Sequence, residues 1–270
     1  IEPNNASFRS GLLFAQNYLS DQPGEALLAE AKQYGELVSR QVRPFTIWTS
    51  ATSTGKMLRV GLVSGYFCRH PAGYFVENVM AGIARRSPQR IELYGYASDF
   101  KEDDLTQRVQ ANCAGWKVLS GIADEQAAKM IHDDQIDILI DLSGHTAHHR
   151  LSMFAWKPAP VQLSWLGYFA TTGLAQIDYL IADDWSLPHS EERHFVEKIW
   201  RLPVTRLCFT PPAEDVQVND LPALTNGYIT FGCFNHLGKI NDQVVALWAR
   251  VLQAVPGSRL FLKSPPLAEA

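Results

Sequence analysis

The stretch Ile136-Asp137-Ile138-Leu139-Ile140-Asp141 decides the fold class, because it predicts a strand with apolar side chains on both faces. Such a strand is buried between two layers of helices, as in a parallel sheet. Similar strands are predicted at 58–63, 91–97, 116–119, 161–165 and 177–182, with helices over 75–83, 105–113 and 123–133. This alternation is typical of βαβ units and predicts an open, doubly wound α/β sheet of the Rossmann type.

Changes in composition divide the chain into five segments. Residues 1–42 predict two short helices, and 43–57, rich in Thr and Ser, predict an exposed linker and a domain boundary. The sheet lobe covers 58–210, a Pro-rich and acidic linker covers 211–226, and 227–270 begin a second lobe. In that lobe, strands are expected at 228–234 and 259–263, around a helix over 242–255 capped by Asp242.

The second lobe is too small to stand alone. Two strands and one helix cannot bury both faces of a parallel sheet. The chain also begins without Met. We therefore expect it to be a piece of a longer protein.

Charge and cysteine content exclude several classes of protein. The 270 residues carry 24 Lys and Arg against 28 Asp and Glu, so no basic excess is available to bind nucleic acid or an anionic membrane. No apolar run reaches the length of a membrane span, and the first residues do not resemble a secretory signal. The four cysteines are far apart and have no metal-ligand spacing, which predicts a reducing, cytoplasmic location.

Several common catalytic motifs are missing from the sequence. It has no GxGxxG after a strand, no GxxxxGK[ST] loop and no GxSxG elbow. His189 and His194 lack the spacing of the HExxH zinc motif. Dinucleotide, P-loop, serine-hydrolase and zinc-peptidase chemistry therefore have no support.

The first candidate site follows the first strand of the sheet lobe, at Ser64-Gly65-Tyr66-Phe67-Cys68-Arg69-His70-Pro71-Ala72-Gly73. Pro71 suits the first position of a helix, which predicts His70 at the N-cap, beside free N–H groups and the positive end of the helix dipole. Ligands of open α/β sheets bind outside the carboxyl ends of the strands. His70 could therefore donate to a phosphate or meet a reacting hydroxyl, and a plain helix cap is the alternative.

The second candidate site is Asp141-Leu142-Ser143-Gly144-His145-Thr146, again just after a strand. Asp141 could orient a ligand or an imidazole, and His145, His148 and His149 could in principle bind a metal. Because no paired acidic or thiolate ligand accompanies them, we expect no metal, and solvated loop histidines are the alternative.

Two further segments could contact a ligand. In Trp165-Leu166-Gly167-Tyr168 an aromatic strand ends in a glycine that would let a ligand approach the backbone, and an ordinary turn is the alternative. Lys239 precedes the helix of the second lobe, where it could neutralise a diphosphate, and a solvated surface lysine is the alternative.

Taken together, these segments resemble the SPINDLY and O-linked N-acetylglucosamine transferase family of protein O-glycosyltransferases. The resemblance covers most of residues 25–263. The SPINDLY branch is nearest, judged by Gly144-His145-Thr146-Ala147, Arg201-Leu202-Pro203 and Leu207-Cys208-Phe209-Thr210-Pro211.

The resemblance implies a two-lobed glycosyltransferase B fold, with 58–210 as its N-terminal lobe and 1–42 as the junction to tetratricopeptide repeats. It implies transfer, with inversion and without a metal or other cofactor, of one sugar to a Ser or Thr hydroxyl of an acceptor protein. The donor would be UDP-N-acetylglucosamine or GDP-fucose.

Site residues follow from the same resemblance. His70 matches a histidine once proposed as general base, and Lys239 matches the lysine that binds the departing diphosphate; both are candidate catalytic residues. The candidate donor-binding residues are Ala72, Leu166, Gly167, Asn235 and His236. Tyr34 and Tyr66 are candidates for the sugar or acceptor side, where the animal enzymes carry a histidine and an aspartate.

Two other functions stay open. The departures at Tyr66 and Gly238 permit a repeat-based protein-interaction module whose transferase domain has decayed, and a nucleotide-sugar epimerase would share the architecture. Since most of the second lobe is missing, we expect the 270-residue chain to be inactive alone.

Overall fold

The computed structural model describes residues 4–19, 21–49, 55–99, 101–211, 216–264 and 267. The chain forms two compact units, residues 1–211 and 212–270. No helix among the described residues is long and apolar enough to cross a membrane.

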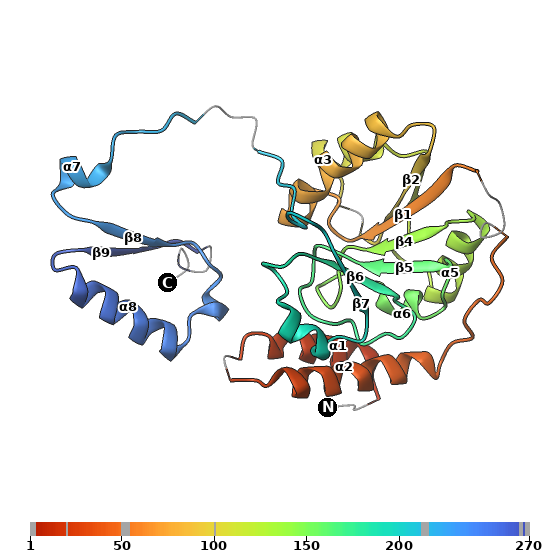
Figure 1. Ribbon diagram of the computed structural model, residues 1–270, viewed down its shortest axis with the longest axis horizontal. Helices are drawn as coiled ribbons and strands as arrows, with labels where there is room; N and C mark the ends of the chain where they lie inside the picture. Colours follow the sequence, from red (N-terminus) through yellow and green to blue (C-terminus); the bar gives the residue numbers. More distant parts are fainter. Residues whose placement is uncertain are drawn as a thin grey trace. The chain divides into compact units, whose positions relative to one another are not determined.

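The first unit is built on a seven-stranded sheet with the order β3-β2-β1-β4-β5-β6-β7 (Figure 1). Every neighbouring pair is parallel, which confirms the predicted fold class. The strand order reverses between β1 and β4, the point at which ligands bind in doubly wound sheets. The strands are β1 (Leu58–Ser64), β2 (Ile91–Ala97), β3 (Gly115–Val118), β4 (Ile138–Asp141), β5 (Val161–Ser164), β6 (Tyr179–Ala182) and β7 (Lys198–Arg201).

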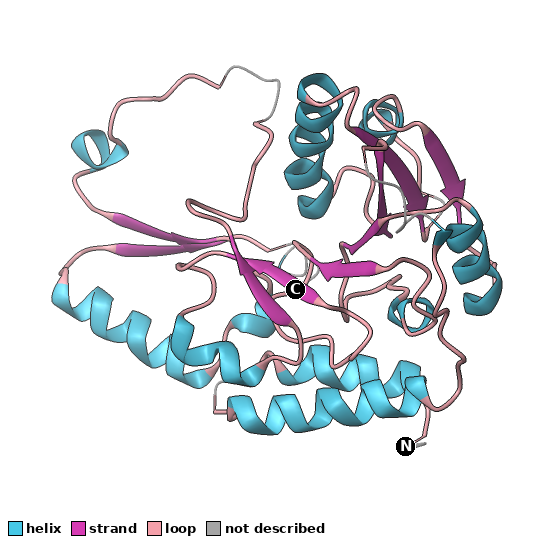
Figure 2. Cartoon of the chain, turned by 45° about the vertical axis from the view of Figure 1, so that its right-hand side comes forward, coloured by secondary structure: helices cyan, strands magenta, loops and turns pink. Residues whose placement is uncertain are grey.

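Helices cover both faces of this sheet (Figures 1 and 2). One face packs against α3 (Pro71–Arg86) and α4 (Asp104–Gln110), with Leu62 meeting Val76 and Met80 in one core cluster. The other face, which carries Val63 and Leu139, packs against the remaining four helices. Neighbouring strand residues such as Leu62 and Val63 point to opposite faces, so both must be apolar. The four helices are α1 (Ala6–Gln16), α2 (Gly24–Ser39), α5 (Asp124–Asp133) and α6 (Leu151–Phe154).

Helices α1 and α2 belong to the same compact unit as the sheet, whereas the sequence predicts a domain boundary at 43–57. Residues 43–49 lie along the lobe: the Phe45 N–H donates to the Trp156 carbonyl (2.8 Å), and the Phe45 ring stacks on His132. The Trp48 indole donates to the Lys157 carbonyl (3.1 Å). Residues 50–54 of this predicted linker lie outside the described residues.

Strand β7 and the 3-10 helix η2 (His189–His194) before it were not predicted. Helix α1 begins at Ala6, because Asn5 caps it and accepts hydrogen bonds from the N–H groups of Ser7 and Phe8.

The second unit contains α7 (Pro222–Asn226), β8 (Thr230–Cys233), η3 (Leu237–Lys239), α8 (Asp242–Ala254) and β9 (Arg259–Leu262). Strands β8 and β9 pair in parallel. The predicted linker 211–226 thus ends in a short helix, and its residues 212–215 lie outside the described ones. The cap of α8 is Asn241, whose side chain accepts from the Val244 N–H (3.0 Å); the expected cap, Asp242, is the first helical residue.

Candidate active site at the carboxyl edge of the sheet

Four loops, which follow β1, β2, β4 and β5, meet at the carboxyl edge of the sheet. The Ser98 hydroxyl, just past β2, donates to the His148 carbonyl (2.6 Å) in the loop after β4. The Tyr66 ring, after β1, lies edge-to-face with the His148 ring. The side chain of Tyr168, after β5, lies against Gly144. The segments that the sequence singled out in this lobe are therefore neighbours in space.

His70 is the N-cap of α3, as predicted. Its Nδ1 accepts a hydrogen bond from the Ala72 N–H (3.2 Å), and Pro71 occupies the first helical position. Pro71 has no N–H, and the Ala72 N–H is taken by the imidazole. This helix start therefore offers fewer free donors to an anion than its position alone suggests.

The cap fixes the tautomer of a neutral His70 ring. A nitrogen that accepts an N–H carries no proton, so the proton of the neutral imidazole lies on Nε2. Burial, together with the charge of Lys101, holds the pKa of His70 below its usual 6.5. Near neutral pH the ring is therefore uncharged, and its Nε2–H is a hydrogen-bond donor.

Tyr66 covers His70. The two rings stack with centroids 3.9 Å apart and planes 15° apart. Both side chains are partly exposed. Because of its burial, the pKa of the Tyr66 phenol lies above its usual value, so the hydroxyl stays protonated.

The loop that carries His70 is held from α4, a feature that the sequence analysis missed. The Asp103 carboxylate accepts from the Arg69 N–H (2.6 Å) while it caps α4 by accepting from the Thr106 N–H (3.1 Å). On the other side, a Cβ on Gly73 would lie 2.2 Å from the Cys68 carbonyl oxygen. The Asp-x-x-Thr capping pattern was the available sequence signal.

Asp141 closes a turn, which corrects the expectation that it orients a ligand or an imidazole. Its carboxylate accepts from the N–H groups of Ser143 (3.1 Å) and Gly144 (2.8 Å) and from the Ser164 hydroxyl (3.2 Å). Complete burial raises the pKa of this carboxyl to about 6. Asp141 therefore shapes the exit from β4.

Two of the three neighbouring histidines point into the protein. Across the described ranges, no three His, Cys, Asp or Glu side chains are grouped so that they could hold a metal ion. The rings of His145 and His149 each lie 2.8 Å from the Ser10 hydroxyl of α1. His148 is exposed, with its ring 3.9 Å from the Asp99 carboxylate.

The packing of the protein backbone itself requires glycine at position 167. A Cβ there would lie 2.0 Å from the Leu142 carbonyl oxygen. Leu166, the residue before it, has a φ of +78°, a conformation that costs a leucine about 1 to 3 kcal/mol. The residues that follow β5 thus pack directly on the residues that follow β4. They include one strained, partly exposed residue, Leu166.

Tyr34 lies in the core. Its side chain has no exposed surface, its hydroxyl is 3.5 Å from that of Ser152, and its ring packs edge-to-face on His145. Burial raises the pKa of the phenol. The structure therefore separates Tyr34 from the partly exposed pair Tyr66 and His70.

In the second unit, the candidate residues follow β8. His236 caps η3 by accepting from the Gly238 N–H (3.1 Å), and Asn235 lies beside the Cys233 sulfur (3.7 Å). Lys239 ends η3, two residues before the α8 cap, and is exposed. Lys239 is therefore available to a ligand at this edge of the β8–β9 pair.

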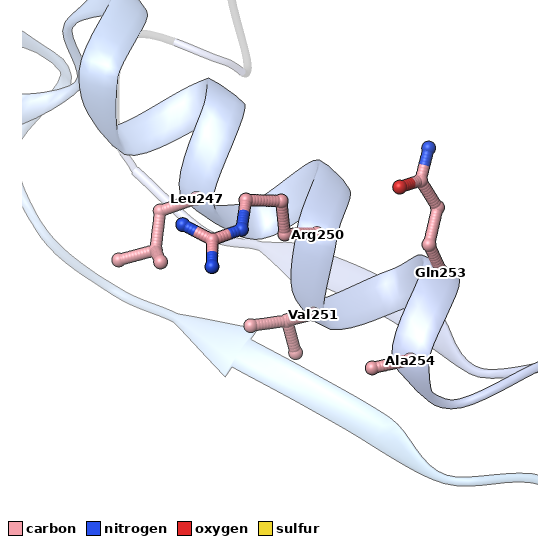
Figure 3. A pocket seen from close by; sticks show the side chains of 5 residues that line it. All are labelled: Leu247, Arg250, Val251, Gln253 and Ala254. Carbon is pink, nitrogen blue, oxygen red and sulfur yellow. The ribbon is translucent and has the colours of Figure 1, made fainter.

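Three depressions on the described part of the chain are lined by residues other than the candidate site residues. A depression of about 440 Å³ is lined by Leu247, Arg250, Val251, Gln253 and Ala254 (Figure 3). All five residues belong to α8, so the depression is one face of a single helix and lacks the converging polar groups of a ligand site. Two further cavities, of about 370 and 390 Å³, lie at the amino ends of β5–β7 and along α3.

The chain belongs to glycosyl transferase family 41, whose family model matches residues 35–209. It is 37% identical, over 98% of its length, to a probable UDP-N-acetylglucosamine–peptide N-acetylglucosaminyltransferase SPINDLY of Petunia hybrida, and 36% identical to the SPINDLY protein of Arabidopsis thaliana. It spans only 29% of the length of each of these relatives.

A solved structure agrees with this assignment. An O-GlcNAc transferase of Thermobaculum terrenum, the K341M mutant, matches 97% of this chain with a TM-score of 0.85 and 34% identity, and the chain covers 49% of it. The first unit thus has the fold of the N-terminal lobe of a glycosyltransferase B enzyme.

Proposed function

We propose that the protein containing this chain transfers N-acetylglucosamine from UDP-N-acetylglucosamine to Ser or Thr hydroxyls of an acceptor protein. The observation that supports this most directly is the half-buried, neutral His70 at the switch point of the sheet, in a chain 37% identical to a protein named for that transfer. Inversion at the sugar carbon and independence from a metal are parts of the same proposal.

His70 acts in this proposal as a hydrogen-bond donor. Its Nε2–H can donate to the sugar or to the acceptor, but His70 cannot take a proton from the acceptor hydroxyl, because its only basic lone pair is on Nδ1 and accepts the Ala72 N–H. Use of His70 as a general base would require the other tautomer and would break the cap of α3. The acceptor proton must therefore leave through another group or through water.

Lys239 offsets the charge of the leaving diphosphate. As the bond between sugar and phosphate breaks, negative charge builds up on the diphosphate oxygens, and a cation fixed beside them lowers the barrier. Lys239 is exposed just before a helix start, which favours negative charge as well. Asn235 and His236 come from the same loop, and Leu166 and Gly167 contribute backbone on the sugar side.

The test combines binding and turnover in the full-length protein. Thermal-shift titrations with UDP-N-acetylglucosamine, UDP, GDP-fucose and GDP identify the donor, because a ligand at one hundred times its Kd stabilises the folded state by about 2.7 kcal/mol. We expect stabilisation by the two uridine ligands only. Stabilisation by the guanosine ligands would identify GDP-fucose as the donor. The absence of stabilisation by all four ligands would favour the protein-interaction module.

The role of Lys239 is tested by Lys239→Ala, which should lower turnover by orders of magnitude. The matched control is Lys198→Ala, which removes an exposed lysine at the amino end of β7, the opposite edge of the sheet. Full turnover in Lys239→Ala would contradict the assignment.

A further inference from the structure

Helix α1 touches two of the loops that form the candidate active site, through two of its polar side chains. Ser10 contacts His145 and His149 in the loop after β4. Asn17, the residue that ends α1, donates from its amide to the Tyr168 hydroxyl (2.8 Å) in the loop after β5. Ser10, His145 and Tyr168 are all almost completely buried.

The contacts of Ser10 form a chain of hydrogen bonds whose direction is fixed at both ends. The Leu151 N–H donates to His149 Nδ1 (3.3 Å), so neutral His149 carries its proton on Nε2 and donates to the Ser10 oxygen. At the other end, His145 Nε2 lies 3.0 Å from the Thr172 carbonyl and must donate to it. His145 Nδ1 therefore accepts the proton of the Ser10 hydroxyl.

This series of hydrogen bonds requires both imidazoles to be neutral. Burial lowers the pKa of His145 to about 3 and that of His149 to about 4. Each of the two rings thus has one donor and one acceptor, and the single hydroxyl of Ser10 satisfies one of each.

The Thr172 end of this series of hydrogen bonds is also fixed by the protein. The Thr172 N–H donates to the buried carboxylate of Glu197 (2.8 Å), and the hydroxyls of Thr171 and Thr172 bind the same carboxylate. Gly173, the next residue, lies against the Ala31 carbonyl of α2. Helices α1 and α2 are thereby both fixed to the segment that follows β5.

Tyr168 connects α1 to the strained part of the site. The Tyr168 ring lies edge-to-face with His145 and against Gly144, so it spans the exits of β4 and β5. Leu166, with its positive φ, is only two residues away. A positive φ in a leucine persists only where the surroundings enforce it, and Tyr168, anchored by Asn17, is part of these surroundings.

We propose that Ser10 and Asn17 of α1 are positioning residues, which hold the exits of β4 and β5 in the shape that binds the sugar of the donor. This inference rests on the proposed function. Neither side chain touches the donor; each acts through a loop that does. Helix α1 is therefore part of the active site's support, in addition to any role toward segments that precede it.

The test compares two ligands in the full-length protein. The variants are Ser10→Ala and Asn17→Ala, and the matched control is Ser7→Ala, which removes an exposed hydroxyl from the same helix. Calorimetry gives the Kd of UDP-N-acetylglucosamine and the Kd of UDP for each protein. We expect the Kd of UDP-N-acetylglucosamine to rise at least fivefold in the two variants, the Kd of UDP to change less than twofold, and the control to match the wild type.

A purely structural role would give a different result. It would raise the Kd of both ligands equally, or change neither Kd, while lowering the melting temperature of the protein. Either result would overturn the inference. Where Asn17→Ala does not fold, Tyr168→Phe removes the same hydrogen bond from the loop side and keeps the ring.

The histidine tautomers provide a second readout. Long-range 1H–15N spectra of the wild type should show both His145 and His149 protonated on Nε2, and a proton on Nδ1 of either would overturn the hydrogen-bond chain. A wild type that binds no UDP-N-acetylglucosamine would instead mean that the proposed function fails, and the inference falls with it.

Discussion

The imidazole of His70 lies flat against the phenol of Tyr66, with the two ring centroids 3.9 Å apart. One face of the imidazole is thereby removed from water, while its Nδ1 is engaged by the backbone of α3. This leaves Nε2 as the atom of His70 through which a ligand can be bound.

Opening this stack should change the protonation of His70. We expect Tyr66→Ala to raise the pKa of His70 toward 6.5, because burial is the main cause that lowers it, whereas Tyr66→Phe should keep the pKa low. An NMR titration of the His70 ring measures this directly. An equally low pKa in Tyr66→Ala would show that other groups bury the ring.

Replacement of His70 by two different residues separates its role as the N-cap of α3 from its role as a hydrogen-bond donor to the substrate. Asn can cap a helix but lacks the Nε2–H, and Ala lacks both. We expect His70→Ala to cost about 1 kcal/mol of stability and His70→Asn much less. Turnover in the full-length protein should fall in both variants. Normal turnover in His70→Asn would mean that His70 is only a helix cap.

The buried histidines should make the fold sensitive to acid. Folding lowers the pKa of His145 to about 3 and of His149 to about 4, so between pH 6.5 and 4 the unfolded chain binds more protons, and stability falls as the pH falls. Asp141, whose pKa is raised to about 6, opposes this in part because it binds its proton more tightly when folded.

The contribution of one histidine can be isolated. His149→Gln keeps a donor toward Ser10 but removes the titrating group, so the slope of unfolding free energy against pH should fall by about 1.4 kcal/mol per pH unit in this range. Urea unfolding at a series of pH values measures the slope. Equal slopes in the wild type and the variant would contradict the assigned pKa shift.

The contact between α2 and the segment after β5 should tolerate no added atom. A Cβ on Gly35 would lie 1.9 Å from the Gly173 carbonyl oxygen. We therefore expect Gly35→Ala to cost about 3 kcal/mol or more. Gly11→Ala in α1 is the control: nothing lies within 4 Å of its added Cβ, and helix propensity should give a gain of about 1 kcal/mol. Thermal unfolding distinguishes the two, and similar melting temperatures would disprove the contact.

The sequence predicts the parts of the fold whose signals are local. The strand at Ile138–Asp141 is apolar on both faces because helices cover both, and Pro71 marks the first turn of α3 because its missing N–H costs nothing there. Strand β7 was missed because Lys198 and Arg201 flank only two apolar residues, which is typical of a strand at the edge of a sheet.

The candidate site was predictable only in part, for a physical reason. The sequence predicts that the loops after β1, β4 and β5 lie together, because parallel strands share their carboxyl edge. It does not predict which groups their polar side chains bind, because those partners lie far away in the sequence. Asp141 serves its own turn, and His145 and His149 bind Ser10, which precedes His145 by 135 positions in the chain. No local pattern contains such a contact.

That same separation has a consequence for how the molecule is made. Helix α1 leaves the ribosome well before its partners, because His145 follows 135 residues after Ser10 and Tyr168 follows 151 residues after Asn17. At about 5 to 20 residues per second, roughly 7 to 30 seconds pass before Ser10 can meet His145. During synthesis, α1 must therefore wait for its partners, and the face that packs on the sheet lobe cannot be fully covered until the segment after β5 has been made.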